Sequence, residues 1–273
     1  MPFQKHEHEF VNKDIHILDE KECKLISPFA CFVVGCTGSG KSWSVLQWLK
    51  NPTLVFREKY NDIYYFYGST YQDVFRHPCL KHVHFISNDL NKNMLEKITT
   101  QIHKKPGILL ILDDLMNVAA NSRVIENLYT RGSHHHNIDV INIIQNYFYK
   151  APNFVTLKEN SQYVFVKRFI NDGKIKLLAT QVGVDSDELT TAYLESLNKD
   201  RYEGILIDNH IASNIRKVGK IRDKIASNTP GLYITPRSFL HFHKKGVLRH
   251  MGGDEYHLDF ALLKDKCLSY NTS

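Results

Sequence analysis

Short apolar runs alternate with amphipathic stretches along most of the chain. The apolar runs are rich in aliphatic, β-branched and aromatic residues, and they predict strands at 29–34, 62–68, 82–87, 108–112, 139–146, 162–166 and 202–208. Helical spacing predicts helices at 42–50, 88–105, 121–129, 173–183 and 188–197. Strands that alternate with helices indicate an α/β fold, in which a mostly parallel central sheet is flanked by helices.

The two ends of the chain differ from this pattern. Residues 1–27 are polar apart from a short apolar stretch at 15–18, and we interpret them as a segment that precedes an α/β domain at 28–209. Residues 210–273 contain 11 Lys and Arg against 5 Asp and Glu, which accounts for the whole formal net charge of +6. This basic C-terminal extension is compatible with contact to a polyanion such as nucleic acid, or with a solvated surface.

Composition narrows the class of protein further. An apolar fraction of 42% is sufficient for a buried core, and no apolar run approaches the roughly 18 residues of a membrane-spanning helix. The charged N-terminus lacks the apolar centre of a signal peptide, and the five cysteines contain no C-x-x-C pair. We therefore expect a soluble, intracellular protein whose cysteines are reduced.

The strongest motif lies between the first predicted strand and the first predicted helix. It fits the G-x-x-x-x-G-K-[ST] pattern of a phosphate-binding P-loop and consists of Gly35, Cys36, Thr37, Gly38, Ser39, Gly40, Lys41 and Ser42. The backbone N–H groups of such a loop and the N-terminus of the following helix favour bound phosphates. We expect Lys41 to reach the β- and γ-phosphates of ATP, and Ser42 to hold Mg²⁺. The alternative is a chance glycine-rich turn. Such a turn would not require the flanking strand and helix, which therefore favour the P-loop.

Two carboxylates follow the apolar run at 108–112. Five consecutive apolar residues indicate a strand buried on both faces of a parallel sheet, and ligands bind beyond the carboxyl ends of such strands. Asp113 is therefore expected to hold Mg²⁺, directly or through water, and Asp114 to activate the attacking water. The alternative is that an Asp at a strand–helix junction only caps the helix.

Two amides, Gln145 and Asn146, end the next predicted strand. An amide at that position can contact the γ-phosphate or position a water molecule, because the carboxyl ends of parallel strands share one edge of the sheet. We therefore predict that Gln145 senses the γ-phosphate. The alternative is that both amides only cap the following turn.

These motifs together resemble the viral DNA-packaging ATPases of the FtsK–HerA superfamily, in the poxvirus-like group that also occurs in Polinton elements. The run Asp113-Asp114-Leu115-Met116 is similar to the extended Walker B motif of that group. The most recognisable block of the packaging-ATPase group is similar to residues 130–137, the strand that follows, and Gln145-Asn146-Tyr147-Phe148. Residues 160–165, 179–181 and 204–208 are similar to its later elements, so the resemblance covers roughly 28–218 in consistent order.

The resemblance implies a P-loop NTPase fold and a ring of five or six copies that pumps double-stranded DNA into a capsid. The expected partners are DNA, gripped without sequence readout, and a capsid or portal-vertex protein at the site of virion assembly. An arginine supplied across the subunit boundary would stabilise the γ-phosphate. Arg131 is our first candidate, before Arg168 and Arg216. The arginines that the family often has at 153–156 and 169–172 are missing here.

Three adjacent histidines, His134, His135 and His136, lie in the same block. Adjacent side chains point in different directions, whereas zinc sites use spaced ligands. We therefore favour a structural or DNA-facing loop over a zinc site.

Three other functions are compatible with a P-loop. A HerA-type or conjugation-type DNA translocase would use the same ATPase site for a cellular or plasmid task. A small-molecule kinase would be monomeric and would have a lid with clustered arginines. A nucleotide-dependent structural switch would lack the carboxylates at 113–114, so their presence argues against it.

Overall fold

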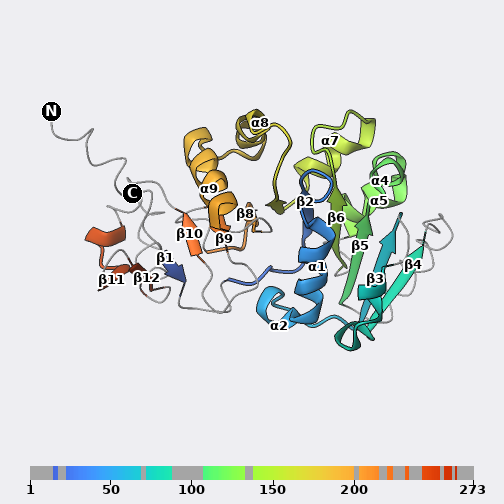
Figure 1. The fold of residues 1–273 in the computed structure, drawn as a ribbon, viewed down its shortest axis with the longest axis horizontal. Helices are drawn as coiled ribbons and strands as arrows, with labels where there is room; N and C mark the ends of the chain where they lie inside the picture. The colour runs from blue at the N-terminus through green and yellow to red at the C-terminus, as the bar shows by residue number, and fades with distance from the viewer. Residues whose placement is uncertain are drawn as a thin grey trace. The chain divides into compact units, whose positions relative to one another are not determined.

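The computed structural model describes residues 15–17, 23–68, 72–87, 107–132, 138–199, 203–214, 220–223, 231–233, 242–252, 255–259 and 262, and the structural statements below concern these residues. The chain forms two compact units, which are residues 25–170 and residues 1–24 together with 171–273 (Figure 1). The domain boundaries expected at residues 28 and 209 stay a prediction. None of the described helices is long and apolar enough to cross a membrane.

A parallel sheet forms the centre of the 25–170 unit. Its strands are β2 (Ala30–Val34), β3 (Asp62–Tyr67), β4 (Val83–Ser87), β5 (Ile108–Asp113), β6 (Ile138–Ile144) and β7 (Tyr163–Val166). They lie in the order β7-β2-β6-β5-β3-β4, and each neighbouring pair is parallel. Every residue of β2, β5, β6 and β7 is buried. The predicted α/β fold with a mostly parallel sheet is confirmed.

The register of these strands brings their carboxyl ends to one edge of the sheet. Val34 at the end of β2 pairs with Ile144 of β6 on one side and with Val166 of β7 on the other. Asp113 at the end of β5 pairs with Ile143 of β6. The segments that follow these strands therefore emerge beside one another.

Helices of the 25–170 unit form two separate groups. α1 (Lys41–Lys50) packs against α2 (Pro52–Val55) and the short 3₁₀ turn η2 (Pro78–Leu80), which follows η1 (Asp73–Arg76). α4 (Met116–Asn121), α5 (Arg123–Asn127) and α7 (Pro152–Glu159) pack together with the π-helical turn η3 (Leu128–Gly132), as Figure 1 shows in green to yellow.

The helix expected at 121–129 is wrong in its extent. Ser122 has extended backbone angles, and its hydroxyl accepts a hydrogen bond from the N–H of Ile125 at 3.4 Å. A serine that caps a helix in this way ends one helix and begins the next, so α4 and α5 are separate. α7 was not predicted, although Pro152 stands at its first turn, where proline is well tolerated. The helix expected at 88–105 lies outside the described residues.

The second unit, residues 1–24 with 171–273, contains two helices and a mixed sheet. The helices are α8 (Gly173–Val182) and α9 (Ser186–Lys199), which pack against each other. The strands are β8 (Ile205–Asp208), β9 (Ile221–Asp223), β10 (Gly231–Tyr233), β1 (Ile15–Ile17), β12 (Glu255–Leu258) and β11 (Leu248–Gly252), in that spatial order. Only the β1–β12 pair among these described neighbours is parallel. The basic extension therefore contains strands that the sequence pattern did not reveal.

Candidate nucleotide-binding site

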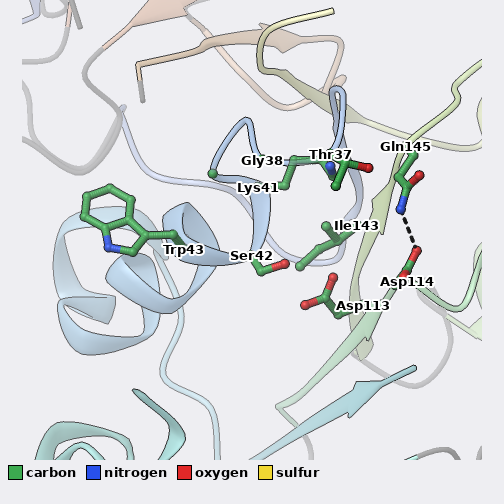
Figure 2. Close-up of a pocket in the computed structure, with 10 residues that line it drawn as sticks. Thr37, Gly38, Lys41, Ser42, Trp43, Asp113, Asp114, Ile143 and Gln145 are labelled. Atoms are coloured by element: carbon green, nitrogen blue, oxygen red, sulfur yellow. Dashed lines mark hydrogen bonds between the residues drawn. The ribbon is translucent and has the colours of Figure 1, made fainter. Parts of the chain in front are cut away.

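A cavity of about 240 Å³ lies at the carboxyl edge of the parallel sheet (Figure 2). It is lined by Thr37, Gly38, Gly40, Lys41, Ser42, Trp43, Asp113, Asp114, Ile143 and Gln145. The structure thus brings together the P-loop, both predicted carboxylates and the predicted amide, which come from the ends of three strands. Gly35, Cys36 and Ser39 complete the loop but are not among the lining residues.

The P-loop leaves the start of α1 without a side-chain cap. Gly40 is the N-cap of α1 and has a left-handed conformation with φ of 81°, which a side chain would disfavour. Because glycine has no side chain to cap the helix, the first N–H groups of α1 can bind an anion instead. The start of the loop is held by a hydrogen bond from the N–H of Cys36 to the carbonyl of Arg168, at 2.8 Å.

The ammonium group of Lys41 is held against the loop. Its Nζ donates a hydrogen bond to the carbonyl oxygen of Cys36 at 2.8 Å, and the side chain is largely buried. Burial lowers the pKa of Lys41, while the nearby carboxylates of Asp113 and Asp114 act in the opposite direction. A bound polyphosphate would add negative charge around this group, which favours its protonated form.

Asp113 is the buried carboxylate of the site. Its Oδ2 accepts a hydrogen bond from the hydroxyl of Tyr65 on β3 at 2.6 Å. Burial raises the pKa of Asp113, and the hydroxyls of Tyr65 and Ser42 oppose that shift because they favour the ionised carboxylate. Sequence reasoning did not find Tyr65, because the pairing of β3 with β5 is what brings it to Asp113.

The donor set of Ser42 and Asp113 fits magnesium. Mg²⁺ takes oxygen ligands and is commonly bound by one or two carboxylates together with substrate phosphates and waters. Among the described residues no group of three or more His, Cys, Asp or Glu forms a metal site of its own. A metal here would therefore depend on the nucleotide for part of its coordination.

Asp114 turns away from the sheet beside its buried neighbour. It has φ of 58°, the only positive φ among the described non-glycine residues, and its side chain is exposed. Its N–H donates to the carbonyl of Ile143 at 3.3 Å, which ties the turn to β6. A left-handed aspartate at a strand end is uncommon and concentrates at functional sites.

The two amides at the end of β6 have different partners. The Nε2 group of Gln145 donates a hydrogen bond to Oδ1 of Asp114 at 3.1 Å (Figure 2). The Oδ1 atom of Asn146 accepts from the N–H of Phe148 at 3.0 Å and so caps the following turn. Gln145 thus faces the cavity, whereas the capping alternative describes Asn146.

A buried lysine that sequence reasoning missed lies beneath the P-loop. Lys167 follows β7, its side chain is fully buried, and its Nζ donates to the hydroxyl of Ser44 on α1 at 3.1 Å. Its backbone N–H also donates to the carbonyl of Val34 at 2.7 Å. The only sequence signal was a lysine directly after a fully apolar strand.

The remaining predicted residues are not among the described residues that line the cavity. The backbone of Arg131 lies in η3, and its side chain is outside the described part of the structure. Arg168 is exposed, and its carbonyl holds the start of the P-loop. Arg216 and the histidines at 134–136 lie outside the described residues.

Comparison with known families shows to which protein family the chain belongs. The family described as Poxvirus A32 protein matches residues 20–222, about three quarters of the sequence. The chain belongs to the A32 family. The resemblance to poxvirus-like packaging ATPases is therefore confirmed. Among curated proteins, none matches this A32 family member.

Several solved structures are similar to this A32 family member at low identity. One is the genome packaging NTPase B204 from Sulfolobus turreted icosahedral virus 2 in complex with ATP-gammaS, at 14% identity and a TM-score of 0.44. The match covers 66% of this chain and 92% of the B204 chain. Another is EssC (ATPases 2 and 3) from Geobacillus thermodenitrificans, at 13% identity and a TM-score of 0.44. The match covers 89% of this chain and 45% of the EssC chain.

Proposed function

We propose that this member of the A32 family is an ATPase that drives double-stranded DNA into a viral capsid. The observation that carries the proposal is the single cavity in which Lys41, Ser42, Asp113, Asp114 and Gln145 meet. A P-loop alone would support only nucleotide binding, whereas a buried carboxylate and an exposed carboxylate at the end of β5 support hydrolysis. Membership of the A32 family directs that hydrolysis towards genome packaging.

The residues of the cavity divide the work of hydrolysis. The P-loop N–H groups and the Lys41 ammonium bind the phosphates, and the helix dipole of α1 favours their charge. Ser42 and Asp113 hold Mg²⁺, which when bound neutralises charge on the β- and γ-phosphates. Asp114 accepts the hydrogen bond of the attacking water and withdraws its proton. Gln145, fixed to Asp114, orients that water and contacts the γ-phosphate.

A neighbouring copy completes the site in this proposal. An arginine supplied across a subunit boundary would stabilise charge on the γ-phosphate at the moment of transfer. Arg131, in the block at residues 130–137, remains our first candidate. Each complete site then lies between two neighbouring copies, and the resemblance to FtsK–HerA packaging ATPases implies a ring of five or six copies.

The proposed packaging of DNA into a capsid implies two partners, the DNA and a capsid protein. Double-stranded DNA is gripped through its phosphates without sequence readout, so its affinity falls steeply as salt rises. The positive charge of residues 210–273 makes this region a candidate contact for DNA. A capsid or portal-vertex protein anchors the ring where virions are assembled.

The decisive experiment measures ATP hydrolysis with and without long duplex DNA. We expect DNA to stimulate hydrolysis by the wild-type protein, and the Lys41→Ala variant to lose both basal and stimulated activity. Lys50→Ala, at the opposite end of α1, is the matched control and should behave like the wild type. Phosphorylation of a small acceptor without any response to DNA would instead support a kinase. A particle that stays monomeric with ATPγS and DNA would also contradict a packaging motor.

A further inference from the structure

Trp43 lines the cavity, and the hydrolysis mechanism gives it no role. Trp43 is the third residue of α1, directly after the residues that hold the phosphates and the metal, and its side chain is 53% exposed. Figure 2 shows its indole on the far side of Lys41 and Ser42 from Asp113, Asp114 and Gln145. A large apolar side chain that is half exposed at the rim of a binding cavity indicates a contact surface for a ligand.

The second tryptophan of the chain shows that this exposure is not a general property of α1. Trp48 lies five residues later, about 140° further round the helix, and is buried. Its ring packs edge to face against Phe165 of β7, with centroids 4.9 Å apart. Trp48 therefore anchors the helix to the sheet, whereas Trp43 lines the cavity.

The orientation of a bound nucleotide follows from the proposed function, on which this inference rests. The γ-phosphate end is fixed by Asp113, Asp114 and Gln145, and the inner phosphates lie on the N–H groups of the loop and of α1. The nucleoside must then leave the loop on the side away from the carboxylates. That is the side on which Figure 2 places the indole of Trp43.

We infer that Trp43 is the stacking platform for the nucleobase of ATP and ADP in this protein. The indole offers an extended aromatic face, and a base stacked on it is shielded from water on that side. Stacking uses the ring face rather than the hydrogen-bonding edges of the base. Trp43 therefore supplies affinity for the nucleoside part of the ligand, and it acts on adenine and guanine alike.

Two ligands separate this role from phosphate binding. Calorimetric titration with Mg-ADP measures base and phosphate contacts together, whereas inorganic tripolyphosphate with Mg²⁺ measures the phosphate contacts alone. We expect Trp43→Ala to weaken ADP binding roughly 5- to 150-fold, the range that the loss of one base–aromatic stack predicts. GDP should lose affinity by a similar factor, and tripolyphosphate affinity should not change. Trp43→Phe, which keeps a smaller aromatic face, should lose less than the alanine variant.

A matched surface variant controls for the loss of an exposed apolar side chain. Val155 on α7 is 52% exposed and does not line the cavity, so Val155→Ala should leave both titrations unchanged. Fluorescence gives an independent readout, because Trp43 and Trp48 are the only two tryptophans. ADP should change the emission of the wild type, and this change should disappear in Trp43→Phe, where only the buried Trp48 remains.

The outcomes distinguish this inference from the proposed function. If the wild type binds neither ADP nor ATPγS, the proposed ATPase function fails and the role of Trp43 fails with it. If the wild type binds ADP and Trp43→Ala binds it equally well, only the stacking role is overturned. An alanine variant with unchanged ADP affinity but an altered oligomeric state would assign Trp43 to a subunit contact instead. Equal loss of ADP and tripolyphosphate affinity would show damage to the P-loop and would likewise overturn the inference.

Discussion

The side chain of Gln145 is hydrogen-bonded to that of Asp114, although 31 residues separate them in the sequence. The Nε2 group of the amide donates to Oδ1 of the carboxylate at 3.1 Å. Parallel pairing of β5 with β6 places the two strand ends side by side, so both side chains reach one point of the cavity. An acceptor and an amide held together in this way can bind one water molecule between them and the γ-phosphate.

This pair leads to a prediction about hydrolysis. Asp114→Asn should lower the single-turnover rate of ATP hydrolysis about 10²- to 10⁴-fold, because it removes the group that accepts the proton of water. Gln145→Ala should lower it by about 10- to 100-fold, since the water is then less well oriented. The affinity for ADP should change little in either variant, because neither residue holds the α- or β-phosphate.

The two substitutions should not be additive. Each removes a group that acts through the other, so the double variant should lose less rate than the product of the single effects. Asn146→Ala is the control, because Asn146 caps the turn at Phe148 and does not line the cavity. Rapid-quench measurements on the wild type, the two single variants, the double variant and Asn146→Ala test this. Full additivity, or a slow Asn146→Ala, would show that the pair does not act as a unit.

Gly68 provides a second prediction about the same carboxylate. A Cβ atom at this position would lie 2.8 Å from the carbonyl oxygen of Asp114 and 3.2 Å from Cδ2 of Leu115. The first neighbour is backbone and cannot move aside without shifting the Asp114 turn. We expect Gly68→Ala to reduce hydrolysis at least about 10-fold, because small displacements of a catalytic group are costly.

Gly173→Ala tests whether the effect at Gly68 is local. A Cβ at Gly173 would lie 3.1 Å from Oδ1 of Asn171, which is the end of a side chain and can rotate. Gly173 begins α8 and its N–H donates to Oδ1 of Asn171 at 2.9 Å, so alanine there should leave hydrolysis unchanged and change the free energy of unfolding by less than about 1 kcal/mol. Steady-state ATPase assays and urea unfolding check both variants. A Gly68→Ala protein with normal turnover would show that the close approach to Asp114 is not needed.

The parts of the fold that the sequence predicted are those with a strong local signal. Buried strands such as β5 are continuous apolar runs, and the P-loop has a fixed spacing, so neither depends on distant contacts. The break at Ser122 was missed because serine is tolerated inside helices, and only the backbone angles of the folded chain show that it caps α5. Helix boundaries of this kind depend on packing rather than on periodicity.

Two residues of the site were missed in the sequence for another reason. Tyr65 meets Asp113 only because β3 pairs with β5 in one register, and Lys167 meets Ser44 only because β7 lies beside β2. Register is a property of two segments far apart in the chain, so no single motif records it. The short strand β9 was missed because two of its three residues, Arg222 and Asp223, are charged and nevertheless buried.

The burial of Arg222 leads to a prediction about stability. Its Nη2 lies 3.1 Å from Oδ2 of Asp208, and both side chains are about 98% or more buried. Its Nη1 also donates to the carbonyl of Cys23 at 2.7 Å. Removing one partner leaves a buried charge uncompensated, so Arg222→Leu should lower the free energy of unfolding by about 3–5 kcal/mol.

A double substitution separates the charge from the loss of packing. Asp208→Asn/Arg222→Leu removes both charges of the pair, and the amide can still bond with Ser213 and with the N–H of His210, which contact Asp208 in the wild type. We therefore expect the double variant to be more stable than Arg222→Leu alone, with a coupling of at least about 1 kcal/mol. Urea unfolding of all four proteins measures it. Simple additivity would show that the two side chains stabilise the fold independently.

Asp139 lies at the amino end of β6 and therefore away from the cavity. It leads to a prediction about how stability depends on pH. Its carboxylate accepts hydrogen bonds from the N–H of Phe29 at 2.7 Å, from the hydroxyl of Tyr60 at 2.6 Å and from the hydroxyl of Ser27. Burial raises the pKa of Asp139 to about 6, although these hydrogen bonds oppose the shift. The unfolded chain should have a pKa near 3.9 for the same group.

The sign of the effect follows from which state binds the proton more tightly. Between about pH 4 and pH 6 the folded protein keeps the proton of Asp139 while the unfolded chain has lost it. The free energy of unfolding contributed by this group therefore falls as pH rises, by about 3 kcal/mol in total, and is constant above about pH 6. Asp139→Asn removes the titration. The stability of the wild type relative to this variant should therefore fall between pH 4 and pH 6 and then level off.

Tyr60→Phe provides the matching test of the cause. It removes a hydrogen bond that favours the ionised carboxylate, so the pKa of Asp139 should rise further and the fall in stability should extend to higher pH. Urea unfolding at half-unit steps from pH 4 to pH 8, for the wild type and both variants, measures the three curves. If the difference between wild type and Asp139→Asn does not depend on pH, burial does not control this carboxylate. If Tyr60→Phe moves the curve towards lower pH, the hydrogen bond does not favour the ionised form.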